Sequence, residues 1–202
     1  MKKLIFFLIA TLVAVSPALA QEKRIMKLAQ TEAKKSAKKY DKEGYKMMEA
    51  GDLEVKLSEF FYEEKSEKKI QFYGQAIRTK RTNAIDEAIF NALSNYSVTQ
   101  GGIMKGRATQ EIASIGEDEI NNYISAYERL LVQELKGEVR PRVTLIKDSK
   151  KQYDVIVYCL LDQDAAHKAR MAALKNAAEE QQLIQKYGEE ISSFIDNGLN
   201  KE

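Results

Sequence analysis

Only two side chains, Cys159 and His167, belong to the types that most often serve as catalytic base, reactive thiol or zinc ligand. Cys159 lies in the apolar, β-branched run 153–161, where a thiol behaves as a small buried hydrophobic group. His167 is flanked by Lys168 and Arg170, and no nucleophile elbow or triad signature surrounds it. A structural zinc site needs about four Cys or His ligands. We therefore expect no catalytic residue, no metal site and no cofactor.

The glycine-containing segment 100–108 matches a phosphate-binding loop only in part. Gly101 and Gly106 have the spacing of that motif, but Arg107 and Ala108 replace its Lys and its metal-binding hydroxyl. A helix, not a strand, is predicted before it, so its amides would not be presented to a phosphate. The sequence therefore predicts a flexible loop between two helices at this position.

Adjacent carboxylates occur at residues 63–64, 179–180 and 189–190. A pair of carboxyl groups can act as the acid and the base of a hydrolase, although most such pairs on helices belong to solvated faces. An envelope hydrolase is therefore an alternative, and it requires a deep cleft with at least two convergent, desolvated carboxylates. A binding protein would instead present a convex body with an exposed apolar stripe.

Charge is distributed unevenly along the chain. The formal net charge is +2, but residues 21–46 carry +5 and residues 47–202 carry −5 once the lysines at positions 2 and 3 are set aside. Residues 21–42 are therefore predicted to form a basic helical arm. An exposed basic helix can bind an anionic membrane or wall polymer. The candidate contacts are Lys23, Arg24, Lys27, Lys34, Lys35, Lys38 and Lys39.

A helix is predicted from residue 165 toward the end of the chain, with Asp162 or Asp164 as its N-cap. About 30 helical residues would span about 45 Å, longer than a small domain is wide, so the helix must break near Gly188 or project. Its second half carries an apolar stripe suited to a protein partner or to self-association. The stripe consists of Leu183, Tyr187, Ile191, Phe194 and Ile195.

The N-terminal twenty residues have the pattern of a secretory signal peptide. Two lysines precede the apolar run 4–15, and the small-residue site Ala18-Leu19-Ala20 follows it. The run has about 12 residues, fewer than the roughly 20 that span a membrane. A lipid anchor would need Cys where Gln21 stands. We therefore expect a soluble periplasmic or secreted chain with no transmembrane segment and no nucleic-acid partner.

The composition indicates one globular domain. Among 202 residues, 44% are hydrophobic and 31% charged, which excludes collagen-like, disulfide-scaffolded, polytopic membrane and mostly disordered chains. Strands are predicted at residues 44–49, 70–77, 139–147 and 152–161. Helices are predicted at residues 53–65, 82–96 and 118–136. The last two strands form an antiparallel hairpin in which Pro141 indicates an edge or a bulge.

These elements define an α+β fold. We expect a three- to four-stranded, largely antiparallel sheet, helices packed on one face and a long C-terminal helix. Small alanines on the helix 82–96 favour close approach to the sheet. The predicted organisation is a signal peptide at 1–20, the basic arm at 21–42, an α+β core at 43–164 and the C-terminal helix at 165–202.

The order of these elements resembles a family of small exported envelope proteins. The residues that carry the resemblance are the strand 70–77, the helices 82–96 and 118–136, and Tyr153-Asp-Val-Ile-Val-Tyr158 in the hairpin. They are similar to surface lipoproteins of the "Lpp-twenty" type and to the N-terminal domain of a flagellar assembly protein. Tyr40-Asp-Lys-Glu-Gly-Tyr45 and Asp52-Leu-Glu54 look like an added variant segment. The match covers residues 40–165 and implies no enzymatic site.

The sequence thus predicts an exported, non-enzymatic protein that acts through protein contacts. The basic arm and the C-terminal helix are the elements expected to reach a partner. Two alternatives stay open: a hydrolase that uses a carboxylate pair, and a binder of anionic membrane or wall polymer through the basic arm.

Overall fold

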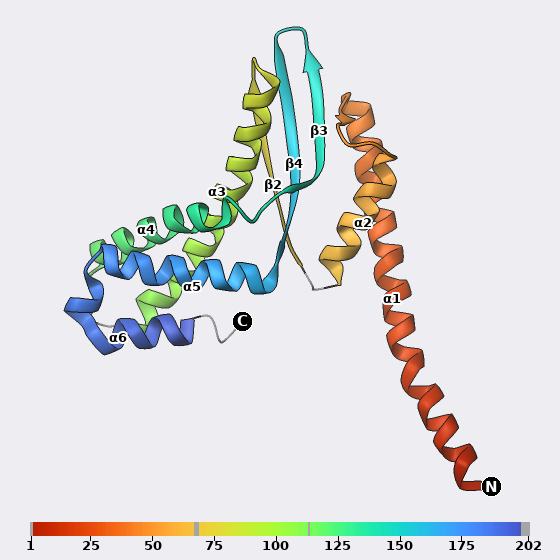
Figure 1. Cartoon of the computed structure of the whole chain (residues 1–202), viewed down its shortest axis with the longest axis horizontal. Helices are drawn as coiled ribbons and strands as arrows, with labels where there is room; N and C mark the ends of the chain where they lie inside the picture. The colour runs from red at the N-terminus through yellow and green to blue at the C-terminus, as the bar shows by residue number, and fades with distance from the viewer. Residues whose placement is uncertain (1, 67–68, 113, 199–202) are drawn as a thin grey trace.

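The computed structural model describes residues 2–66, 69–112 and 114–198, with their side chains from Ala20 onward. Figure 1 shows the helices and strands of this part of the chain. The helices are α1 (Lys2–Glu43), α2 (Leu53–Lys65), α3 (Arg81–Glu111), α4 (Glu117–Leu135), α5 (Gln163–Glu180) and α6 (Leu183–Gly198). The strands are β1 (Lys46–Met47), β2 (Lys69–Arg78), β3 (Pro141–Ser149) and β4 (Gln152–Asp162).

The four strands form one antiparallel sheet in the order β1-β3-β4-β2. The predicted hairpin is β3 and β4, and its register shifts between Pro141 and Val143, as the proline indicates. β2 pairs with β4 along its whole length, from Lys69 opposite Asp162 to Arg78 opposite Tyr153. The longest strand of the sheet is therefore central, and β2 lies at an edge.

One face of the sheet packs against α3, the helix of the predicted alanine stripe. Ala84, Ala88 and Ala92 are fully buried, and Ala88 and Ala92 lie against Gly74 in β2. A Cβ atom built on Gly74 would lie 2.1 Å from the carbonyl oxygen of Ala88. The expected close approach of helix and sheet is therefore confirmed, and it depends on small residues in both elements.

The segment predicted as a loop continues α3 instead. Gly101 and Gly106 are helical, and α3 extends to Glu111. Tertiary packing overrides the low helix propensity of glycine here, because Gly101 is buried where α4 crosses and a Cβ atom on it would meet the Glu128 side chain. The second half of α3 therefore passes the end of the sheet and packs with α4, α5 and α6 (Figure 1).

The other face of the sheet is covered in part by α1 and α2, which pack against each other. Alternate residues of β4 point to opposite faces: Val157 and Cys159 lie in the core beside α3, and Ile156 and Tyr158 pack with α1 and α2. The fold class, the antiparallel sheet and the C-terminal helical segment are confirmed. Helices nevertheless lie on both faces, not on one as expected, because β4 is apolar on both sides.

The C-terminal segment breaks into two helices. Asp162 caps α5, and its side chain accepts a hydrogen bond from the amide of Asp164 at 3.0 Å. The chain reverses after α5 at Gln182, which has a φ of 56°, so that α6 folds back onto the body. A kink at Gly188, with a φ of 39°, lies inside α6. The predicted helix is therefore interrupted twice, at Gln182 and at the predicted position Gly188. Residues 199–202 of the predicted helix lie outside the described part.

Candidate functional site

The residues of the C-terminal apolar stripe lie in the core. Leu183, Ile191, Phe194 and Ile195 are buried, and Tyr187 packs against the same cluster. α6 places them against the end of α3 and against α4, and the rings of Phe194 and Tyr123 are 6.3 Å apart. The prediction that they contact a partner is therefore corrected: the stripe stabilises the domain itself.

The basic arm is part of the fold as well as a charged surface. Ala29, Ala33, Ala37 and Tyr40 form the inward side of α1 and pack with α2. Leu28, outside this packed side, is 51% exposed. The seven candidate cations are all exposed along α1.

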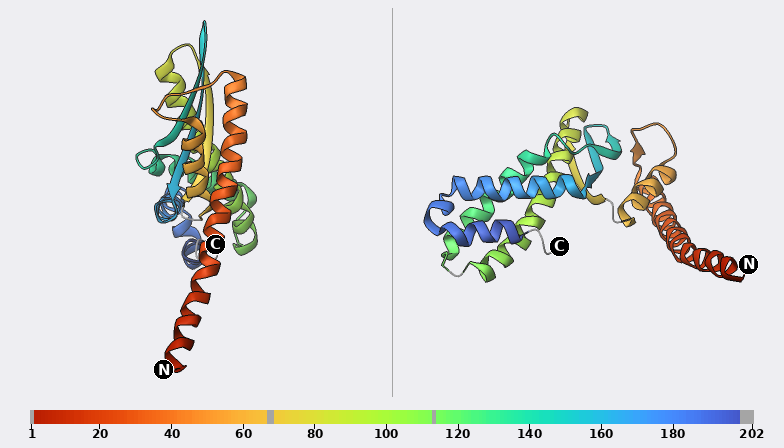
Figure 2. Two further views of the ribbon diagram at one scale, coloured as in Figure 1. Left: turned by 90° about the vertical axis from the view of Figure 1, so that its right-hand side faces the viewer. Right: turned by 60° about the horizontal axis from the view of Figure 1, so that its bottom comes forward.

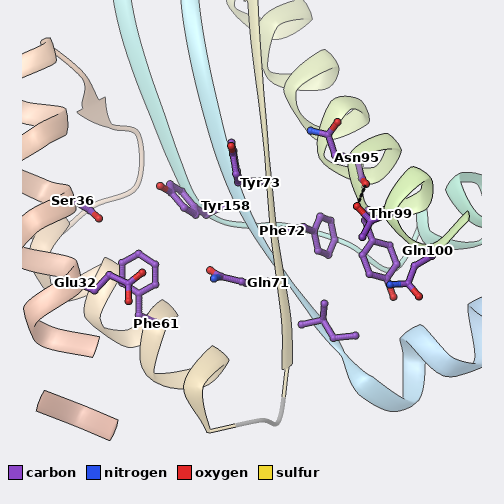
Figure 3. Close-up of a pocket in the computed structure, with 12 residues that line it drawn as sticks. Glu32, Ser36, Phe61, Gln71, Phe72, Tyr73, Asn95, Thr99, Gln100 and Tyr158 are labelled. Carbon is purple, nitrogen blue, oxygen red and sulfur yellow. Dashed lines mark hydrogen bonds between the residues drawn. The ribbon is translucent and has the colours of Figure 1, made fainter. Parts of the chain in front are cut away.

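A groove lies along β2 between α1 and α2 on one side and α3 on the other (Figure 3). Its volume is about 650 Å³, which is within the range of ligand-binding pockets. It forms because α1 and α2 cover β3 and β4 but leave the same face of β2 open. As a result Tyr73 is 61% exposed and Ile77 is 46% exposed. We call this hollow the β2 groove.

The wall of the β2 groove beside α1 and α2 is aromatic. Phe61 and Tyr158 line it, and Tyr73 lies against Tyr158 with ring centroids 6.2 Å apart. The Tyr158 hydroxyl forms a hydrogen bond with the Tyr40 hydroxyl, so α1 is joined directly to β4. Burial, followed by this hydrogen bond, raises the pKa of Tyr158, and the ring stays neutral.

The opposite wall comes from α3 and combines aromatic and amide side chains. Phe72 in β2 stacks on Tyr96 with ring centroids 5.3 Å apart. Asn95, Thr99 and Gln100 also line this wall. Gln100 accepts a hydrogen bond from the Arg170 guanidinium at 3.2 Å, which fixes the direction of its amide. The wall therefore offers hydrogen-bonding groups around an apolar centre.

The edge of β2 between these walls is open to a further strand. In the described part of the chain, β2 pairs with β4 alone. The carbonyl of Gln75 accepts a hydrogen bond from the Asn91 side chain at 2.9 Å, outside the sheet ladder. Because every second residue of an antiparallel strand directs its backbone groups to the same edge, Gln71 and Tyr73 present theirs there too.

One carboxylate, Glu32, is among the residues that line the β2 groove. It is 2.8 Å from the ammonium of Lys65, and this hydrogen bond is the main cause of the raised pKa of Lys65. The described residues that line the groove therefore include no carboxylate pair of the kind that a hydrolase uses. The groove combines aromatic side chains, amide side chains and an open strand edge.

The other sequence candidates lie apart from the β2 groove. Glu189 and Glu190 line a small hollow of about 270 Å³ with Glu111. Cys159 is buried in the core beside α3, as predicted, and burial raises its pKa to about 12. His167 is half-buried in the first turn of α5. None of these four side chains lines the β2 groove.

The described residues form neither a metal site nor a membrane span. No cluster of three or more His, Cys, Asp or Glu side chains among them is placed to hold a metal ion. None of the described helical segments combines the length and apolarity that crossing a membrane requires. Compared with known proteins, the chain matches no family model, no curated protein and no solved structure. The resemblance to exported envelope proteins therefore stays a prediction.

Sequence reasoning missed the β2 groove, although one signal for it was present. In the strand 69–78, Phe72, Gly74 and Ala76 are buried by α3, and the alternate residues Gln71 and Tyr73 are exposed. Such alternation is typical of a strand with one open face. The position of β2 at the sheet edge depends on the pairing of distant strands.

Proposed function

We propose that this protein is an exported, non-enzymatic binding protein, and that the β2 groove binds an extended segment of a partner protein. The observation that supports the proposal best is the ten-residue strand β2, which lies at the sheet edge beside a groove of about 650 Å³. An exposed edge strand offers unpaired N–H and C=O groups, and a peptide strand can pair with them.

The two walls define what the partner segment would contain. A peptide paired with β2 directs alternate side chains to opposite sides. One set would face Phe61, Tyr73 and Tyr158, and the other would face Phe72 and Tyr96. Aromatic side chains contribute most to contacts in such pockets. We therefore infer that the segment carries apolar or aromatic residues on both of its sides.

The test begins with a displayed library of random peptides that is selected on the purified protein. Selected peptides are then studied by hydrogen exchange of the β2 amides. We expect protection of Gln71, Tyr73 and Gln75 on binding and no change at Phe72 and Gly74, whose amides already face β4. Protection confined to other elements, or protection without this alternation, would contradict strand pairing.

Blocking the strand edge is the second part of this test. Tyr73→Pro removes the amide donor at the edge, where proline is tolerated. Affinity for the selected peptides is expected to fall at least about tenfold, because a lost hydrogen bond and the steric block of the ring together exceed about 1.4 kcal/mol. The control, Tyr73→Thr, keeps the amide and is expected to keep alternate protection of β2. Equal binding by Tyr73→Pro and the unchanged chain would sink the proposal.

Export is tested separately. The side chains of residues 1–19 lie outside the described part, so the signal peptide is a proposal that the sequence pattern supports. We expect the protein recovered from the cell envelope or the medium to begin at Gln21, as determined by mass spectrometry. Ala20→Lys is expected to abolish this processing because the cleavage site needs a small residue. The control Glu22→Gln should be processed normally, and recovery of unchanged protein that begins at Met1 would refute export by this route.

A further inference from the structure

The outer side of α1 carries the seven exposed cations Lys23, Arg24, Lys27, Lys34, Lys35, Lys38 and Lys39, which we call the basic face. Within the described residues, none of the seven forms an ion pair. Two of the four anions of the same helix have partners of their own: Glu32 pairs with Lys65, and Glu22 accepts a hydrogen bond from the Tyr62 hydroxyl at 3.2 Å. The positive charge of the basic face is therefore left for an external partner.

Packing holds the basic face in a fixed direction. Ala29, Ala33 and Ala37 lie on one side of α1 and pack toward α2, so at 3.6 residues per turn the cations occupy the opposite side. α1 is the outermost element on this side of the molecule (Figures 1 and 2). From Lys23 to Lys39 the basic face is about 24 Å long at 1.5 Å per residue. It is thus an extended surface that approaches a flat partner without obstruction by the body.

We propose that the basic face docks the protein on the surface of an anionic lipid bilayer. Charge complementarity is the first argument, since each Lys or Arg near such a surface raises the binding constant about fivefold. Residues 47–202 carry a net charge of −5, so the rest of the body is repelled and the docked orientation is defined.

One apolar side chain, Leu28, favours a bilayer over a soluble polyanion. Leu28 is 51% exposed, and at 3.6 residues per turn it lies between Lys35 and Lys39 around the helix, on the basic face. Apolar side chains beside cations on one helix can enter the boundary between lipid head groups and acyl chains. A polyanion in water offers no such apolar layer, and Leu28 would contribute nothing to binding it.

Vesicle flotation tests the proposal, with vesicles of phosphatidylglycerol and phosphatidylcholine compared with vesicles of phosphatidylcholine alone. All variants begin at the same N-terminal residue, and mass spectrometry verifies this. Lys27→Gln/Lys34→Gln/Lys38→Gln is expected to lower affinity for the anionic vesicles about 100-fold. A control with the same net charge, Lys105→Gln/Lys150→Gln/Lys151→Gln, is expected to change it less than about threefold, because screening limits distant charges.

A second variant separates lipid from polymer. Leu28→Ser is expected to weaken binding to anionic vesicles about tenfold and to leave binding to soluble polyphosphate unchanged. Stronger binding to polyphosphate than to vesicles, with no effect of this variant on vesicles, would show a polymer site and overturn the bilayer proposal. Equal flotation of the unchanged chain and the triple lysine variant would overturn it as well. Peptide binding in the β2 groove is measured independently, since this proposal does not rest on it.

Discussion

Gly74→Ala is expected to lower the free energy of unfolding by about 3 kcal/mol, at the upper end of the usual cost of overpacking. The Cβ atom would lie 2.1 Å from the carbonyl oxygen of Ala88 and 2.4 Å from the amide nitrogen of Ala92. Both atoms belong to the backbone of α3, so no side-chain rotation can remove the contact. β2 and α3 would have to separate, and the buried alanines between them would lose their packing.

Urea unfolding measures this effect, and Gly102→Ala is its matched control. A Cβ atom on Gly102 meets no other atom within 4 Å, and the residue lies inside α3. Alanine is favoured over glycine in a helix by about 0.5–1 kcal/mol, so the control is expected to stabilise the protein. If Gly74→Ala unfolds at the same urea concentration as the unchanged chain, the close approach of α3 to β2 is wrong.

Phe194→Ala is expected to cost about 3–5 kcal/mol, the usual loss for a large aromatic side chain in a core. Phe194 is 2% exposed, its ring lies edge-on to Tyr123, and the Arg107 guanidinium is 6.0 Å from its centroid. Removal of the ring would leave a cavity between α6, α3 and α4. For a chain of this size the loss corresponds to a fall in Tm of about 10 °C.

Phe90→Ala is the control for Phe194→Ala, because Phe90 is 55% exposed on α3. Its substitution is expected to change stability by less than about 0.5 kcal/mol, as is usual for surface positions. Thermal unfolding of the three proteins, followed by circular dichroism, gives the comparison. An unchanged Tm for Phe194→Ala would support the prediction from the sequence that the apolar stripe of α6 binds a protein partner.

The secondary structure could be predicted where the signal is local. Asp52 is of a residue type that favours N-caps, and its side chain accepts a hydrogen bond from the Val55 amide at 3.0 Å at the start of α2. The hairpin β3–β4 was recognisable from β-branched runs on both sides of a polar turn. Gly101 is the counterexample, because its helical conformation depends on α4, which is distant in sequence.

The candidate sites also divide into features that follow from local sequence and features that depend on tertiary structure. The exposure of Lys27 or Lys38 follows from charge and helical spacing, and the structure confirms it. The edge position of β2 follows from no local pattern, since it requires that β4 pair with β3 on one side and with β2 on the other. The hydrolase alternative also depends on distant residues, and Glu32, the one carboxylate among the described residues that line the β2 groove, is paired with Lys65.

By itself, the sequence determined most of the helices and strands, with the segment 100–108 as the exception, and it determined where the positive charge is concentrated. It determined these because hydrogen bonding along a helix and alternation along a strand are local periodicities. The tertiary structure alone decided what each apolar side contacts: the stripe of α6 is buried by α3 and α4, and the open side of β2 becomes a groove. The physical reason is that hydrophobic attraction is non-directional, so an apolar stripe specifies burial but not its partner.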